Sequence, residues 1–217
     1  NGLIFSIPSG NFGHAYAGWL AKEMGLPINK ILVATNSNDV LHKLFSENSY
    51  KKGKVTSTLA PSMDISVASN FERLLFNLFN NDSEKLLKTM STFPREKISV
   101  PGEYWEKAED IFLSFPSTDQ EILQEIKNTF ETSNYILDPH TSTGVRAARE
   151  LISPDQSVIT MATAHPSKFI EAIKQVLAED AVEMPSQLRD IEDKQEDFVV
   201  LPDNIDKVRE YIVSSIN

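Results

Sequence analysis

The chain opens with an apolar run that gives way to a turn and then to an amphipathic pattern. Residues 3–7 are apolar and rich in β-formers, which predicts a buried strand. Residues 8–13 combine Pro, Ser, Gly and Asn, which predicts a tight loop. After the loop, apolar side chains recur at three- and four-residue spacing up to Gly25 and Pro27, the expected end of a helix. The first segment is therefore predicted to be a strand, a loop and a helix.

Two further apolar runs predict additional strands. One lies at residues 31–34, and another lies within residues 157–163, with its core at 158–161, and leads into a helix that has Pro166 just inside its start. A strand, helix, strand order favours parallel pairing through a right-handed crossover. We therefore predict an α/β fold with an open, mostly parallel sheet, helices on both faces and the strand at residues 3–7 in the same sheet.

The middle of the chain is mainly helical in pattern. The segment SNFERLLFNLF places Ser69 and Glu72 in capping-box spacing ahead of a row of apolar residues, which predicts a helix. Residues 82–130 mix helical periods with proline breaks and show no clear strand. We predict a mostly helical insertion there.

The chain divides into a main domain and a tail. Residues 1–178 are predicted to form a phosphate-binding α/β domain that carries the insertion at about 82–130. Residues 179–217 are acidic and are predicted to form a C-terminal extension that packs on this domain, with a strand at 198–201 and a last helix at 205–216.

Composition narrows the possible functions. The chain has 217 residues, of which 41% are hydrophobic, so it can bury a full core. A formal net charge of -10 argues against a nucleic-acid partner. The absence of cysteine removes disulfides, thiolate catalysis and Cys-based metal sites, and we predict no metal. No apolar run approaches the ~20 residues of a membrane span, and no signal-peptide pattern is present, so we predict a cytoplasmic protein without a membrane partner.

The first loop has the character of an anion site. Gly10 and Gly13 let the backbone approach a ligand, and the first-turn amides of the following helix present unpaired N–H groups at the same place. A turn without a ligand remains the alternative. The spacing of these glycines fits neither the dinucleotide fingerprint nor the Walker loop. Since ligands gather at the carboxyl ends of parallel strands, we expect the loop, Asn36 and Thr163 to face one cleft.

Five stretches, taken in order, resemble the C-terminal half of threonine synthase, a pyridoxal-phosphate enzyme of fold type II: PSGNFGHAYAG, ILVATNSNDVL, SMDISVASNFERLLF, DPHTSTGV and TAHPSKF. The resemblance covers most of residues 3–177. It implies a lyase that converts O-phosphohomoserine, a small phosphorylated amino acid, and water into threonine and phosphate with pyridoxal phosphate as an electron sink. A threonine-synthase-like phospholyase and a non-catalytic module that binds phosphate or pyridoxal phosphate remain alternatives.

The resemblance also assigns residues. Those that match the segment holding the cofactor phosphate are Ser9, Gly10, Asn11, Phe12 and Gly13. Thr163 matches the position at the pyridine nitrogen, and its alternative is a helix N-cap. Asn70 and Arg73 are candidates for the substrate phosphate, because Arg offers a planar donor fork, and a surface role is the alternative for Arg73.

Other ionisable residues have structural readings beside functional ones. His140 and His165 lie in the matching stretches, and a role in a turn or a cap stays open for both. For Asp64 and Asp138 we prefer the start of a helix or turn over acid–base chemistry. His42 is interpreted as a helix surface residue.

No catalytic residue is predicted within this chain. The Schiff-base lysine of the family lies in an N-terminal segment resembling SFKD, and no such segment occurs here. Lys168 follows a different strand and matches the family's HPAKF stretch instead. We therefore expect that the N-terminal portion of the same protein is missing and that the chain is inactive alone. A sheet separated from its neighbours would expose apolar surface, so self-association is expected.

Overall fold

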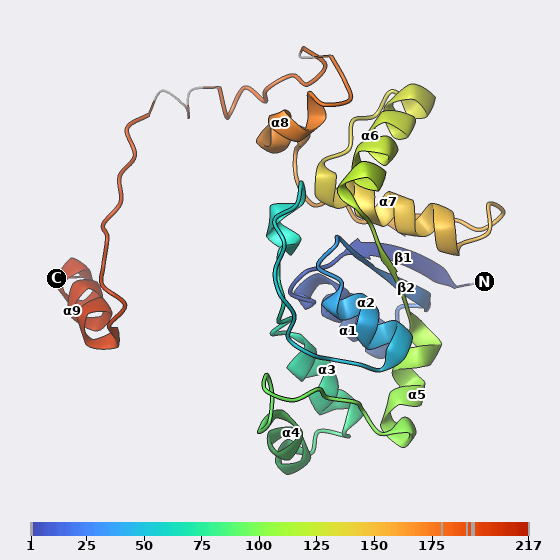
Figure 1. Cartoon of the computed structure of the whole chain (residues 1–217), viewed down its shortest axis with the longest axis vertical. Coiled ribbons are helices and arrows are strands. Elements are labelled where there is room, and N and C mark those ends of the chain that lie inside the picture. The colour runs from blue at the N-terminus through green and yellow to red at the C-terminus, as the bar shows by residue number, and fades with distance from the viewer. Residues whose placement is uncertain (1, 179, 190, 192–193, 217) are drawn as a thin grey trace. The chain divides into compact units, whose positions relative to one another are not determined.

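The computed structural model describes residues 2–178, 180–189, 191 and 194–216. The chain divides into two compact units, Asn1–Glu183 and Met184–Asn217. The first unit contains the sheet and the predicted binding loop (Figure 1). Its end lies close to the predicted boundary after residue 178. Packing of the C-terminal extension on this unit stays a prediction.

The first unit is built on a four-stranded sheet in which all neighbouring strands are parallel. The strand order is β3-β2-β1-β4. The three predicted strands lie in this one sheet, which confirms the predicted α/β class and the parallel arrangement. The strands are β1 (Leu3–Pro8), β2 (Ile28–Thr35), β3 (Phe112–Pro116) and β4 (Val158–Thr160).

Alternate residues of the central strands enter two different cores. Ile7 and Val33 belong to a large core under one group of helices, whereas Ile4 and Leu32 pack with Ala147 on the opposite face. Helices therefore cover both faces, as predicted (Figure 1). The first group comprises α1 (Gly13–Glu23), α2 (Val40–Glu47), α3 (Phe71–Leu78) and α5 (Gly102–Ile111), and the opposite face is covered by α7 (Pro139–Leu151).

A second helix packs against α7. Arg149 of α7 donates from Nε to Oε1 of the buried Glu125 at 2.9 Å. That glutamate belongs to α6 (Asp119–Ser133), which begins with a capping box formed by Thr118 and Glu121. Hydrogen bonds from Thr118 lower the pKa of Glu121. The remaining elements of this unit are η1 (Pro61–Met63), α4 (Ser83–Met90), η2 (Pro166–Phe169) and α8 (Ile170–Ile173).

The prediction of no strand within residues 82–130 is wrong, because β3 lies there at the edge of the sheet. The apolar run of β3 has five residues and ends at Pro116, so its pattern is too short to stand out between two helices. Packing decides its structure. Phe112 contacts Phe45 and Trp19, with ring centroids 4.7 and 5.8 Å apart, and these partners lie far away in the sequence.

The predicted capping box of Ser69 and Glu72 does not form. Helix α3 begins at Phe71, and its N-cap, Asn70, makes no side-chain capping bond. The Ser69 hydroxyl donates instead to Asn11, in the loop after β1. The helix itself is present, as predicted.

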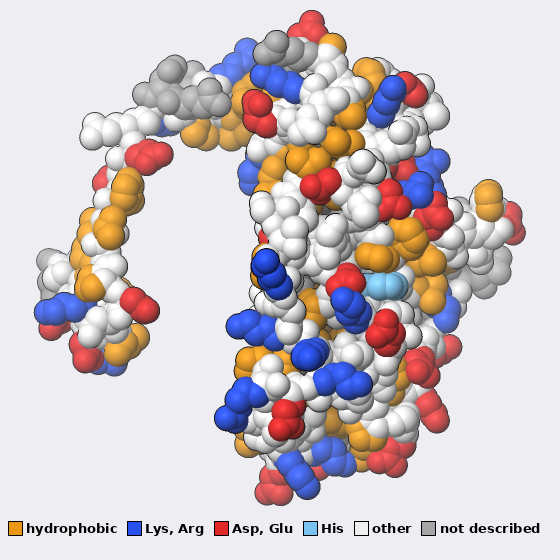
Figure 2. Space-filling model, viewed as in Figure 1, with side chains coloured by type: hydrophobic (Ala, Val, Ile, Leu, Met, Phe, Trp, Pro, Cys, Tyr) orange, Lys and Arg blue, Asp and Glu red, His pale blue; other side chains and the backbone are white. Residues whose placement is uncertain are grey.

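The second unit contains α9 (Ile205–Ile216), which confirms the predicted last helix. Residues 198–201 form no strand, so that prediction is wrong. Phe198, Val199 and Val200 are exposed, and apolar side chains follow this segment in Figure 2. They bury nothing that would stabilise a strand, and no strand pairs with them among the described residues. In that part of the chain and in the first unit alike, no described helix is both long and apolar enough to cross a membrane.

Candidate functional site

The loop Ser9–Gly13 presents a series of backbone N–H groups. Ser9 donates its N–H to the carbonyl of Ala34 at 2.8 Å. The next residue along the chain whose N–H is bonded to a backbone carbonyl is Tyr16, which donates to Phe12 at 2.9 Å. Among the described residues, the N–H groups of Gly10, Asn11, Phe12 and Gly13 have no hydrogen-bond acceptor. Phe12 is left-handed, with φ of 64°, and a residue of this hand beside right-handed neighbours curls successive amides into an anion-binding nest. A loop of this geometry can hold an anion.

At two glycines of the loop, a side chain would come too close to neighbouring atoms. A Cβ on Gly10 would lie 2.9 Å from the Met63 Cα and 3.2 Å from the Ser62 carbonyl oxygen. A Cβ on Gly13 would lie 3.1 Å from Nδ2 of Asn70. Real Cβ atoms do not approach backbone atoms as closely as 2.9 Å, so Gly10 permits the close packing of the loop against η1.

The start of α3 holds the loop in place. The Asn11 side-chain oxygen accepts two hydrogen bonds from Ser69, from the backbone N–H and from the hydroxyl, both 2.7 Å long. Asn70 donates from Nδ2 to the Asn11 carbonyl at 3.0 Å. Asn70 thus supports the loop, and its role toward the substrate phosphate stays a prediction. Arg73 lies one turn further along and is exposed, and its role toward a phosphate stays a prediction.

Phe12 attaches the loop to the large core. Its side chain is 1% exposed. Its ring centroid lies 5.5, 6.3 and 5.6 Å from those of Phe45, Phe71 and Phe112. Since these rings come from α2, α3 and β3, the backbone of the binding loop is fixed by the packing of three elements.

A buried carboxylate, Asp138, organises the second half of the site. It is the N-cap of α7 and accepts from the backbone N–H groups of His140 and Thr141 at 2.9 and 3.3 Å. The Thr141 hydroxyl also donates to Oδ2 of Asp138. Burial alone would raise the pKa of Asp138, but the hydrogen bonds from His140 and Thr141 together outweigh it and lower that pKa. The preferred structural role of Asp138 as a helix start is confirmed.

His140 is locked in one tautomer by its two partners. Its Nε2 accepts from the Ser62 N–H at 3.1 Å, so this nitrogen carries no proton. Its Nδ1 lies 3.0 Å from Oδ1 of Asp138 and therefore donates the ring proton to that carboxylate. The buried ring thus joins η1 to α7, which is a structural role.

Thr163 follows β4 and lies against this carboxylate. Its N–H donates to the Thr141 hydroxyl oxygen at 3.0 Å, and the two hydroxyl oxygens are 3.2 Å apart. The alternative reading of Thr163 as a helix N-cap is wrong. The N-cap of η2 is His165, whose Nδ1 accepts from the Ser167 N–H at 3.2 Å.

One hollow connects the loop to Thr163. It has a volume of about 230 Å³, and Gly10 and Thr163 both line it. His140 and Ser62 contribute to the wall. Lys168 lines the same hollow, although its sequence context gave it no role. The hollow lies at the carboxyl ends of β1 and β4, so the expectation that the loop and Thr163 face one cleft is met by Gly10 and Thr163.

Asn36 does not face this hollow, so that expectation is wrong. It is fully buried, and its Nδ2 donates to the Thr58 hydroxyl and to Oδ1 of Asp64, both at 2.8 Å, and to the Ala60 carbonyl at 3.2 Å. Asp64 also accepts from Asn38 at 2.9 Å. These bonds shape the segment before η1, which confirms a structural role for Asp64.

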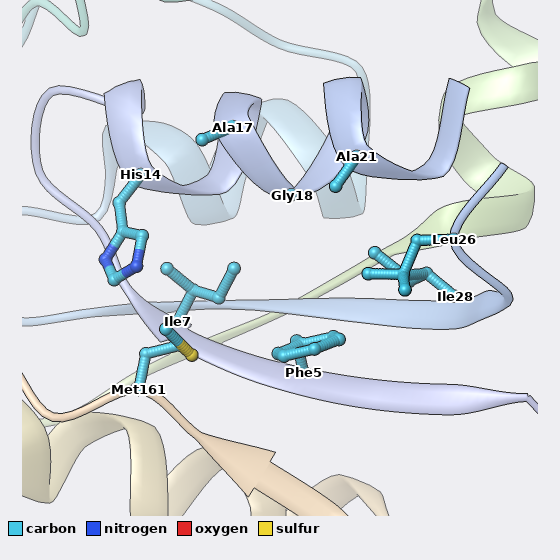
Figure 3. Close-up of a pocket in the computed structure, with 9 residues that line it drawn as sticks. All are labelled: Phe5, Ile7, His14, Ala17, Gly18, Ala21, Leu26, Ile28 and Met161. Carbon is cyan, nitrogen blue, oxygen red and sulfur yellow. The ribbon is translucent and has the colours of Figure 1, made fainter. Parts of the chain in front are cut away.

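A second hollow is apolar and has a volume of about 260 Å³. It lies between α1 and the sheet, beside β1 and the residue that follows β4 (Figure 3). Small residues of α1 form one wall, namely Ala17, Gly18 and Ala21. Phe5 and Met161 line the side of the sheet. Ile159 of the edge strand β4 pairs in register with Phe5 and is 45% exposed. This apolar face ends at a strand that, among the described residues, pairs only with β1.

His14 stands where this apolar hollow meets the binding loop. It is the second residue of α1, and its ring points toward Ile7 and Met161 (Figure 3). Desolvation by these neighbours lowers the pKa of His14, even though part of the ring is exposed. His42 differs from its prediction as a surface residue, because it is half-buried with Nδ1 3.0 Å from the Ser114 hydroxyl of β3.

Metal binding finds no support in the described ranges, which contain no group of three or more His, Cys, Asp or Glu side chains that could hold an ion. The donors of the site are amides and hydroxyls, which suit a phosphate and a ring nitrogen.

The chain is similar to known proteins over nearly its whole length. A family model described as "Threonine synthase, C-terminal" matches residues 141–212. The threonine synthase of Pseudomonas aeruginosa is 41% identical over 212 residues, which are 97% of this chain and 45% of that protein.

Solved structures give the same result. The pyridoxal-phosphate-bound threonine synthase of Brucella melitensis has a TM-score of 0.88 and 35% identity, and the match covers 98% of this chain and 46% of that one. Yeast threonine synthase has a TM-score of 0.86 and 32% identity, with 99% and 47% covered. The chain thus spans less than half the length of these relatives. The resemblance to the C-terminal part of threonine synthase is confirmed.

Proposed function

We propose that this chain is the C-terminal part of a threonine synthase and that its loop Ser9–Gly13 and Thr163 bind pyridoxal phosphate. In the complete protein the reaction is the conversion of O-phosphohomoserine and water into threonine and phosphate. The similarity to threonine synthases, one of them bound to pyridoxal phosphate, supports this function over the phospholyase and the non-catalytic alternatives.

The observation that carries the proposal is that one hollow is lined both by the first residue of a series with free amides and by a threonine. The amides of Gly10–Gly13 lack acceptors among the described residues, and Gly10 and Thr163 line the same hollow. A molecule with a phosphate at one end and a ring nitrogen at the other would satisfy both groups. When bound, pyridoxal phosphate supplies an electron sink for the reacting carbon.

Each part of the chain then has a role. The loop amides bind the cofactor phosphate, helped by the positive end of the α1 dipole. Asn11, which accepts from Ser69, and Asn70, which donates to the Asn11 carbonyl, keep the loop in shape. Arg73 is proposed to bind the substrate phosphate through its planar fork. Thr163 orients the cofactor ring.

The catalytic lysine is proposed to come from the N-terminal portion of the same protein. Lys168 lines the hollow, so its attachment to the cofactor must be tested directly. Its position after β4 matches a different stretch from the family's lysine segment, and we assign it no attachment to the cofactor.

The test uses the full-length protein and the isolated chain side by side. The full-length protein should release threonine and phosphate from O-phosphohomoserine, and borohydride reduction with peptide mapping should label a lysine outside residues 1–217. The isolated chain should bind phosphate or pyridoxal phosphate weakly and reversibly and should form no threonine. A stoichiometric label on Lys168, with turnover by the isolated chain, would contradict the proposal.

The apolar hollow beside α1 is proposed to receive the N-terminal portion. Exposed Ile159 and half-buried Met161 continue the apolar face up to the edge strand β4, and such faces and edges seek partners. In the absence of that portion, we propose that the isolated chain self-associates through the same face. We further propose that the domain of residues 1–178 carries the extension of residues 179–217 packed on it, and that the protein is cytoplasmic. Limited proteolysis and cell fractionation test these last two points.

A further inference from the structure

The binding loop stands against the short helix η1. A Cβ on Gly10 would lie 2.9 Å from the Met63 Cα and 3.2 Å from the Ser62 carbonyl oxygen, so the backbones of the loop and of η1 are in close contact. Gly10, Ser62 and Met63 also line one hollow. The position of η1 therefore sets both the place of Gly10 and the width of the hollow.

Contacts from α6 and α7 fix the place of η1. A helix of three residues has few hydrogen bonds of its own, so it depends on such contacts. Met63 packs in an apolar cluster with Ile122 and Ile126 of α6. The contact with α7 is the hydrogen bond that the Ser62 N–H donates to Nε2 of His140, 3.1 Å long. This bond holds the part of η1 whose carbonyl lies nearest to the loop glycine.

The acceptor nitrogen of His140 is set by the carboxylate behind the ring. Burial alone would raise the pKa of Asp138, but hydrogen bonds from His140 and Thr141 lower it, so this carboxylate is ionised at neutral pH. An ionised carboxylate only accepts, so Nδ1 of His140, 3.0 Å from Oδ1 of Asp138, carries the ring proton and Nε2 is left as an acceptor. The ring is 3% exposed, and its centroid lies 4.6 Å from that of Phe169. Packing therefore keeps Nε2 directed at Ser62.

We infer that His140 is a positioning residue for the binding loop: its Nε2 lone pair holds η1 against Gly10, and the loop keeps its affinity for a phosphate group only while that acceptor is present. This inference rests on the proposed function, because it takes a phosphate group as the ligand of the loop. His140 acts through the backbones of Ser62 and Gly10 and transfers no proton to or from the ligand.

The experiment titrates inorganic phosphate into the full-length protein without cofactor, at pH 7.5, by calorimetry. Two variants at one position separate the acceptor from the bulk of the ring. In His140→Gln the amide oxygen extends about as far as Nε2 and can accept from Ser62, whereas in His140→Asn the amide extends only about as far as Nδ1. The Gln variant should bind phosphate within about threefold of the wild type, and the Asn variant about tenfold more weakly, because it leaves a buried N–H group without an acceptor.

Ser142→Ala is the control for a change at the start of α7. Its buried hydroxyl donates to the Pro139 carbonyl at 2.8 Å, within the same helix, so its loss should leave η1 in place. This variant should bind phosphate as the wild type does. Hydrogen exchange of the Ser62 N–H gives a second readout, which should be slow in the wild type and in His140→Gln and faster in His140→Asn.

Neutron diffraction on crystals of the deuterated wild type gives a readout that needs no variant. A deuteron should lie on Nδ1 of His140 and none on Nε2, and this map decides the inference if the Asn variant does not fold. A deuteron on Nε2 would overturn the inference, and so would equal phosphate affinities of the folded Gln and Asn variants, whether both are tight or both are weak.

The same titrations separate this inference from the proposed function. A wild type that binds phosphate but no pyridoxal phosphate would overturn the proposed cofactor alone, and the Gln and Asn variants would still decide the role of His140. A wild type that binds no phosphate would overturn the loop as an anion site and the inference with it.

Discussion

Asn11 and Ser69 are joined by two hydrogen bonds to a single oxygen, since the Asn11 Oδ1 accepts both the backbone N–H and the hydroxyl of Ser69 at 2.7 Å. The pair links the binding loop to the start of α3. In the predicted capping box between Ser69 and Glu72, the same hydroxyl would have bonded to the backbone of α3 and would not have linked the helix to the loop.

Substitution of this pair should weaken anion binding. Asn11→Ala removes the acceptor of both bonds and should lower the free energy of unfolding by about 1–2 kcal/mol. Ser69→Ala removes one bond and should cost about half as much. Isothermal titration with phosphate should show weaker binding in both variants, and more so in Asn11→Ala. Ser91→Ala is the control, because its hydroxyl donates to the Lys88 carbonyl far from the loop. Unchanged binding in Asn11→Ala would show that the loop keeps its shape without α3.

The glycines of the chain should differ in tolerance. Gly10→Ala places a Cβ 2.9 Å from the Met63 Cα, so the loop must move away from η1. Overpacking of this kind costs about 1–3 kcal/mol, and phosphate binding should weaken with it. Gly53→Ala meets no atom within 4 Å and is the matched control. Urea unfolding and phosphate titration of both variants check this, and equal behaviour of the two would refute it.

His14 should make the chain less stable in mild acid. Its pKa in the fold is lowered from 6.5 by desolvation, so the unfolded chain binds this proton more readily than the folded chain does. The free energy of unfolding should therefore fall as the pH drops through about 6.5. In His14→Asn the loss between pH 7.5 and pH 5.5 should be smaller. Asp138, whose pKa is lowered from 3.8, titrates below this window. Thermal unfolding at both pH values, with identical losses in variant and wild type, would contradict the assignment.

The apolar face beside β4 should govern self-association of the isolated chain. Ile159 is 45% exposed, so Ile159→Lys should leave the fold intact while it places a charge on the face and beside the strand edge. Sedimentation velocity should show a larger monomer fraction for this variant than for the wild type. Leu87→Lys, at a site that is 70% exposed on α4, is the control. A wild type that stays monomeric at high concentration would remove the basis for the prediction.

The sequence allowed the prediction of elements with strong local signals. The strands β1 and β2 contain mainly apolar residues, and the loop between β1 and α1 contains the turn residues Ser9, Gly10 and Asn11. Strand β3 was missed because its structure depends on Phe45 and Trp19, which contact Phe112 from distant parts of the chain.

The candidate site was only partly predictable for the same reason. The loop Ser9–Gly13 and Thr163 were named from motifs, and the structure brings Gly10 and Thr163 to one hollow. The support from Ser69 and the use of Asp138 beneath Thr163 arise between elements, and no spacing along the chain reports them. Asn36 was misplaced because a strand-end polar residue looks the same in sequence whether it faces a ligand or a buried loop.

The strand order has a consequence for how the protein is made. Strand β1 lies between β2 and β4, and Ile4 pairs with Val158. On the ribosome β1 and β2 emerge before β4, which follows most of the helices of the first unit. Until β4 has been synthesised, the edge of β1 that pairs with it has unpaired backbone groups, and Phe5 lacks its neighbour in β4. Contacts between such distant segments form slowly because the loop that joins them must close first. The nascent chain is thus exposed to aggregation during this interval, and a chaperone that covers apolar strands would be most useful to it then.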